Sequence, residues 1–225
     1  MTMMQVSIVV PMLVVWWRRR HFSPPVKSLS WYVYLSAAGS LISALSYPAY
    51  TPNNYGFIIG FNLGKVALFG AVYHQVMEVP GLRKFVAASA LAAVSAVGVV
   101  IAIDLFSAVA LSRVVQCALL AAFALVYLEQ TLTRPGPDTD VAFTTRSPLW
   151  LVGLGQLLYS AGTVTAFSLE ALSQTKADQS YKYIFIALAG MVFNWFLTLA
   201  FLRARRSDYS VAEVKLADFG SLVSS

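Results

Sequence analysis

The chain has 225 residues, of which 58% are hydrophobic and only 12% are charged. Soluble domains carry about a quarter of their residues as charged ones, so this composition and a mean hydropathy of +0.69 exclude an ordinary soluble protein. The net charge of +6 does not indicate a nucleic-acid partner, because the basic residues gather at the ends of apolar runs instead of forming a groove. We therefore expect an integral membrane protein whose first partner is the lipid bilayer.

Seven apolar runs follow one another along the chain, and each is expected to form a membrane-crossing helix. The runs are Met3–Trp17, Trp31–Tyr50, Tyr55–Met77, Phe85–Ile103, Phe106–Leu128, Leu149–Leu172 and Tyr181–Leu202. A spanning helix needs about 17–25 residues, and only the first run is shorter. The predicted fold class is all-α, a polytopic membrane protein with a seven-transmembrane-helix bundle over residues 1–206 and a cytoplasmic tail over 207–225.

The charges between the runs predict the orientation of the helices, because cytoplasmic loops are enriched in lysine and arginine. With the N-terminus outside, the outer segments hold Lys176 and Lys182. The inner segments then hold Arg18, Arg19, Arg20, Lys27, Arg83, Lys84, Arg134, Arg146, Arg203, Arg205 and Arg206. This asymmetry predicts a multi-pass protein of the cytoplasmic (inner) membrane, with the N-terminus outside and the C-terminus inside.

The run Tyr55–Met77 is the one around which we expect the bundle to form. Gly56, Gly60 and Gly64 recur every four residues, and a row of small residues lets a second helix approach closely in lipid. Lys65 lies near the middle of the same run, where a charge costs a few kcal/mol unless it faces protein or water. We therefore expect this helix to be central, with its glycine row in close packing and Lys65 turned inward.

Polar residues near the expected midplane define a candidate ligand pocket. Its members are Asn62, Lys65, Gln156, Tyr159 and Asn194. Two interpretations remain open for this set, because intramembrane polar residues either tie helices together by hydrogen bonds or mark a functional site.

A structural ion pair is expected nearer the outer surface. Arg113 lies about one and a half turns inside the outer end of its run, and Asp104 and Glu170 are the carboxylates near that level. We predict that one of the two carboxylates pairs with Arg113, because pairing lowers the cost of an intramembrane charge. His74 and Glu78 share a helix face but lack further ligands nearby, so no metal site is expected.

Catalytic motifs do not stand out in the sequence. HExxH, GxSxG and a phosphate-binding glycine loop are all missing, so no catalytic residue and no cofactor is assigned. The single cysteine, Cys117, lies inside an apolar run and permits no intrachain disulfide. An enzyme is therefore not the favoured class.

The chain resembles a group of uncharacterised seven-transmembrane-helix integral membrane proteins of Bacteroidetes-type bacteria in three segments, Pro52–Val76, Ser147–Leu169 and Tyr181–Phe201. The matching positions are Asn53, Asn54, Trp150, Gly153, Tyr159, Ser160 and Asn194. Members of the group tend to carry a glutamate where this chain has Lys65, so the resemblance implies a reversed charge at that position. They often look like neighbours of sensor kinases, which implies a cytoplasmic sensor kinase as a partner.

The leading functional interpretation is a sensory or signal-input module that acts through a separate cytoplasmic partner or another membrane subunit. The alternative is a small-solute transporter of three-plus-one-plus-three helix plan, because the first three and last three runs share an orientation and carry Asn62 and Asn194 mid-run. A second alternative is an intramembrane lipid-modifying enzyme, although no pair of acids lies at one depth. The oligomeric state is left open.

Overall fold

The computed structural model describes residues 6–46, 54–133, 147–172 and 176–204, and the side chains within 6–42, 55–133, 147–168 and 184–204. Within these ranges the chain is helical and forms no strand. The α-helices are α2 (Val9–Arg18), α3 (Pro24–Ser46), α4 (Asn54–Val76), α5 (Pro80–Ile103), α6 (Leu105–Thr133), α8 (Pro148–Leu172) and α9 (Lys176–Arg203). A short 3-10 turn, η1 (Arg19–His21), joins α2 to α3.

Five of these helices are long and apolar enough to cross a membrane, namely α4, α5, α6, α8 and α9. The prediction of an all-α, multi-pass membrane protein is thereby supported. The ten residues of α2 span only about 15 Å, which is half of a bilayer core. The 23 residues of α3 include Lys27 and several serines, which lower its hydropathy. The seven-span count and the orientation of the termini therefore stay predictions.

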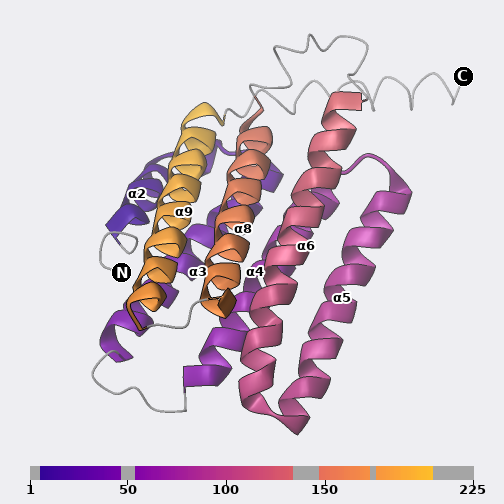
Figure 1. The fold of residues 1–225 in the computed structure, drawn as a ribbon. Coiled ribbons are helices and arrows are strands. Elements are labelled where there is room, and N and C mark those ends of the chain that lie inside the picture. The colour runs from indigo at the N-terminus through magenta and orange to yellow at the C-terminus, as the bar shows by residue number, and fades with distance from the viewer. Residues whose placement is uncertain (1–5, 47–53, 134–146, 173–175, 205–225) are drawn as a thin grey trace, which may run out of the picture.

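The helices form a bundle of two layers (Figure 1). Helices α9, α8, α6 and α5 lie side by side in one layer, and α2, α3 and α4 lie behind them. Helix α4 packs against α3, α5 and α6, while α2 packs against α9 and α3. The Lys65 helix thus has neighbours in both layers, and its predicted central position stays a prediction.

The periphery of the bundle is apolar, as expected for a surface in contact with lipid. On α5, Leu91 is 70% exposed and Val99 is 62% exposed, and only Val86, Ala93 and Val97 of this helix are buried. A monomeric soluble protein rarely exposes a contiguous apolar surface of this kind. The outer faces of the spanning helices are therefore suited to a bilayer.

Along the α4 glycine row, the described residues place a neighbour near Gly64 and none near Gly56 or Gly60. A Cβ atom added to Gly56 or Gly60 would meet no heavy atom of the described residues within 4 Å, and one added to Gly64 would lie 3.5 Å from Leu35. The α3–α4 contact is made by Phe61 instead, whose ring would lie 2.7 Å from a Cβ added to Gly39 of α3. An aromatic ring of α4 thus fills the space over a glycine of α3, and this keeps the two backbones apart.

Hydrogen bonds close the end of the bundle at which α2, α4 and α9 finish and α3 and α5 begin. The Arg18 guanidinium donates to the carbonyl oxygens of Leu202 and Ala204, at the C-terminal end of α9. Ser28 of α3 and Gln75 of α4 exchange hydrogen bonds of 3.4 and 3.3 Å. The described basic residues of the predicted inner segments therefore lie at one end of the bundle.

A labelling experiment tests the orientation predicted from these charges. We expect a cysteine introduced at Ile103, which is 80% exposed beside the α5–α6 turn, to react with a membrane-impermeant maleimide on intact cells. A cysteine introduced at Lys84, at the start of α5, should react only after the cells are opened. The native Cys117 is only 5% exposed and should stay unlabelled. Labelling of position 84 but not 103 on intact cells would mean that the bundle is inverted.

Candidate ligand site around Lys65

Lys65 lies inside the bundle, as the cost of an intramembrane charge predicts, and is only 6% exposed. Its ammonium nitrogen lies 4.3 Å from the ring centroid of Phe61, 5.7 Å from that of Tyr159 and 5.9 Å from that of Tyr32. These distances fall within the roughly 6 Å over which a cation is attracted to an aromatic face. We call Phe61, Tyr159 and Tyr32, from α4, α8 and α3, the Lys65 cage.

The cage offers the ammonium group rings and hydroxyls but no carboxylate. The groups that act electrostatically on Lys65 are Tyr159, Tyr32 and Cys117, and no acid of the described residues is among them. The positive charge is therefore surrounded by neutral groups in the interior of the bundle.

A cluster of aromatic rings holds the cage in place. Phe193 of α9 has its ring centroid 5.6 Å from that of Tyr32 and 5.7 Å from that of Tyr159. Phe69 of α4 lies 5.0 Å from Tyr32 by the same measure. Aromatic pairs at these distances contribute about 0.5–1.5 kcal/mol beyond their buried area. The cage and the rings packed against it thus come from four helices, α3, α4, α8 and α9, so we expect a change in one ring to affect the packing of the others.

Two other members of the predicted pocket are buried but bonded elsewhere. The Asn62 side-chain amide donates to the Ser112 hydroxyl of α6 at 3.0 Å. The Gln156 carbonyl oxygen accepts a hydrogen bond of 3.1 Å from the Tyr73 hydroxyl. Because Tyr73 lies eight residues beyond Lys65 on α4, this bond is about 12 Å further along the helix. Both bonds join helices, as the structural interpretation of these residues predicts.

Asn194 also takes a partner other than Lys65. Its side-chain amide donates to the Ser7 hydroxyl, before α2, at 2.7 Å, and its backbone carbonyl accepts from Thr198 at 2.8 Å. The structure therefore brings only Tyr159, of the predicted pocket residues, into contact with Lys65.

The face of α8 toward the bundle retains unused hydrogen-bonding capacity. The Gln156 amide nitrogen and the Ser160 hydroxyl are buried without a hydrogen-bond partner among the described residues. These two residues lie one turn apart and flank Tyr159 of the cage. An unsatisfied buried polar group costs about 1–3 kcal/mol, so this face is suited to receiving polar atoms from another molecule.

Of the two carboxylates predicted as partners of Arg113, Asp104 is engaged elsewhere. The Asp104 carboxylate caps α6, where it accepts hydrogen bonds of 3.0 Å from the backbone N–H groups of Phe106 and Ser107, and another from the Ser107 hydroxyl. A cap three residues away needs no ordering of a long side chain across the bundle, so it forms in preference to a distant pair. Glu170, the other predicted partner of Arg113, lies outside the residues whose side chains are described.

Asp104 gives a prediction for the dependence of this cap on pH. The Ser107 hydroxyl and the backbone N–H groups of Ser107 and Phe106 lower the pKa of the Asp104 carboxyl. The cap should therefore act fully above the ordinary carboxyl pKa of about 4 and be lost as pH falls through the lower folded value. We expect faster amide exchange at the start of α6 in Asp104→Ala at pH 7, and no such effect of Glu129→Ala at its far end. Equal exchange in Asp104→Ala and the native protein would contradict the cap.

The sequence reasoning missed two residues of the cage, Phe61 and Tyr32. Phe61 precedes Lys65 by four residues, and such pairs lie on the same helix face, so this contact was readable from the sequence. Tyr32 comes from α3, and nothing in its local sequence points to α4.

The chain matches no family model, no curated protein and no solved structure.

Proposed function

We propose that the protein is a signal-input module of the cytoplasmic membrane, in which the Lys65 cage binds an anionic or carbonyl-bearing ligand. The observation that carries this proposal is a buried ammonium group surrounded by aromatic rings without a carboxylate among the described residues. Placing an ion in a protein interior costs several kcal/mol after relaxation. Each cation–π contact returns about 0.5–2 kcal/mol, and a ligand oxygen would supply a charge-assisted hydrogen bond in addition.

The basic end of the bundle supports a separate cytoplasmic partner. Its exposed basic residues include Arg20, Lys27, Arg83, Lys84 and Arg203. Several exposed charges of one sign at one end favour association with an acidic surface. A signal would pass from the cage along α4 and α9, since Lys65 lies on the first, Phe193 on the second, and both helices finish at this end.

Transport is the competing function, and the hydrogen bonds inside the bundle favour signal input over it. The Asn62 amide already donates a hydrogen bond to the Ser112 hydroxyl, and the Gln156 carbonyl oxygen already accepts one from the Tyr73 hydroxyl. These bonds tie α4 to its neighbours at two levels, on either side of Lys65. A solute path along α4 would have to break both.

A binding and uptake experiment separates the two functions. The purified protein is melted in detergent with a panel of small carboxylates, phosphates and ketones at 1 mM each. We expect at least one compound to raise the melting temperature, because a ligand present at 100 times its Kd adds about 2.7 kcal/mol of stability. The same compound, radiolabelled, should not accumulate in liposomes that contain the protein. Accumulation would favour the transporter, and a panel without any stabilising compound would contradict the ligand class.

A further inference from the structure

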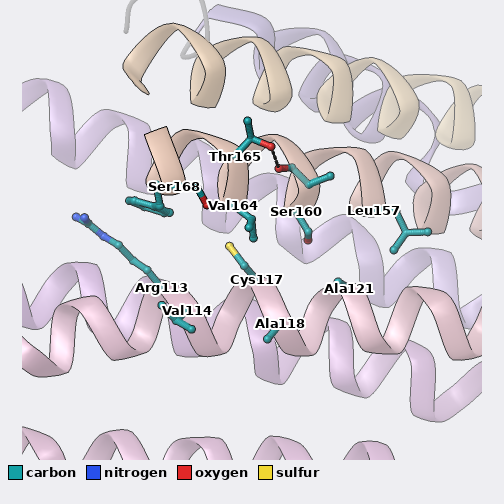
Figure 2. A pocket seen from close by; sticks show the side chains of 12 residues that line it. Arg113, Val114, Cys117, Ala118, Ala121, Leu157, Ser160, Val164, Thr165 and Ser168 are labelled. Carbon is teal, nitrogen blue, oxygen red and sulfur yellow. Dashed lines mark hydrogen bonds between the residues drawn. The ribbon is translucent and has the colours of Figure 1, made fainter. Parts of the chain in front are cut away.

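A groove of about 830 Å³ lies between α6 and α8, outside the Lys65 cage (Figure 2). Cavities that bind small molecules usually measure about 300–1,000 Å³. The groove is wide because its walls carry small side chains at facing positions, such as Ala118 and Ala121 on α6 and Ala161 on α8. Val114 and Val164, on its two sides, are 63% and 54% exposed. Since α6 and α8 are both long and apolar enough to span a membrane, the groove opens toward lipid.

The groove is polar at one end and apolar at the other. Arg113 lies at the end nearer the α5–α6 turn, and Figure 2 shows its side chain reaching along the groove toward Ser168 and away from Cys117. The Asp104 carboxylate is engaged at the start of α6, and Glu170 lies outside the residues whose side chains are described. Beyond Cys117 and Ser160, the lining toward the other end consists of Ala118, Ala121 and Leu157.

Ser160 places a free hydroxyl between these two ends. Its side chain is only 3% exposed, its oxygen lacks a hydrogen-bond partner in the described part of the chain, and it points from α8 toward α6 (Figure 2). Helical hydroxyls in apolar surroundings usually bond to the carbonyl four residues earlier. Thr163 and Thr165 of the same helix do so, at 2.8 and 2.9 Å. The Ser160 hydroxyl remains available for an acceptor in the groove.

We propose that this groove binds an anionic phospholipid that enters sideways from the bilayer. The headgroup phosphate pairs with Arg113, an ester oxygen accepts a hydrogen bond from Ser160, and one acyl chain lies against Ala118, Ala121 and Leu157. The order of cation, hydroxyl and apolar wall matches the order of phosphate, ester and hydrocarbon in such a lipid. The site goes beyond the proposed ligand site, because none of these contacts involves the Lys65 cage.

Native mass spectrometry in detergent with phosphatidylglycerol or phosphatidylcholine tests this inference. We expect the protein to bind phosphatidylglycerol more tightly, and Arg113→Gln to weaken that binding roughly tenfold, since hydrogen bonds to charged groups are the stronger kind. Binding of phosphatidylcholine should change little in this variant. Ser160→Ala should weaken binding of both lipids, because both carry the ester, and Ala118→Phe should reduce both by filling the groove.

Arg203→Gln is the matched control, since it removes an exposed arginine at the other end of the bundle. It should leave the preference for phosphatidylglycerol unchanged. The inference is overturned if the native protein binds the two lipids equally, or if Arg203→Gln weakens phosphatidylglycerol binding as much as Arg113→Gln does. A melting curve of each variant shows that the bundle is intact. None of these outcomes depends on a ligand at Lys65, so the two proposals can fail separately.

Discussion

Gly155→Ala and Gly162→Ala should each lower the melting temperature of the purified protein. We expect the decrease to be larger than for any other glycine-to-alanine substitution in α4 or α8. A Cβ atom at Gly155 would lie 2.6 Å from the Phe196 Cβ, and one at Gly162 would lie 2.7 Å from the Ala189 Cβ. Both neighbours are Cβ atoms fixed to the α9 backbone, so neither can rotate away. The helices must separate instead, and overpacking of this kind costs about 1–3 kcal/mol.

Gly60→Ala provides the matched control for these substitutions. It adds the same methyl group to a spanning helix, but in a place where no heavy atom of the described residues lies within 4 Å. Alanine has the higher helix propensity, by about 1 kcal/mol in soluble hosts, so this variant should be neutral or more stable. Thermal melting in one detergent compares all three proteins. Equal destabilisation by the three substitutions would mean that α8 and α9 are not packed as closely as described.

Lys65→Met should remove ligand binding and leave the bundle folded. Methionine keeps most of the length of lysine and packs well against aromatic rings, so the contacts with Phe61, Tyr159 and Tyr32 can persist. Replacing a buried charge with an apolar side chain is often neutral or stabilising. The affinity for a compound that stabilises the native protein should fall roughly tenfold or more, because a charge-assisted hydrogen bond is lost.

Lys84→Met is the matched control for this substitution. Lys84→Met removes an exposed lysine near the end of the bundle and should leave both stability and ligand affinity unchanged. If Lys65→Met instead unfolds the protein at temperatures where Lys84→Met is intact, Lys65 serves to tie α3, α4 and α8 together. The interpretation of Lys65 as a ligand site would then be wrong.

The depth of each residue could be predicted from the sequence, because the length of an apolar run and a rise of 1.5 Å per residue determine it. Lys65 was expected inside the bundle on this basis, and its side chain is buried there. The rotation of each helix about its axis could not be predicted in the same way. Asn62, Gln156 and Asn194 share the depth range of Lys65, yet their hydrogen bonds go to three different elements.

Contacts between residues close in sequence account for two further differences from the expected arrangement. Asp104 was matched with Arg113 by depth, as Glu170 was, but two backbone N–H groups and the Ser107 hydroxyl offer the Asp104 carboxylate three donors within three residues. The spacing of the α4 glycines predicted a closely packed neighbouring helix. In the structure, the Phe61 ring of α4 occupies the space beside Gly39 of α3. In both cases a contact with a specific neighbouring group determines the packing, and the spacing of residues along the chain does not predict that contact.

A high-resolution density map of the protein, extracted together with its native lipids, tests the central claim most directly. We expect non-protein density bounded by Phe61, Tyr159 and Tyr32, with an atom at hydrogen-bond distance from the Lys65 ammonium nitrogen, about 2.7–3.2 Å. The account is contradicted if the Lys65 side chain points into the acyl chains, or if a carboxylate of the protein itself occupies that place.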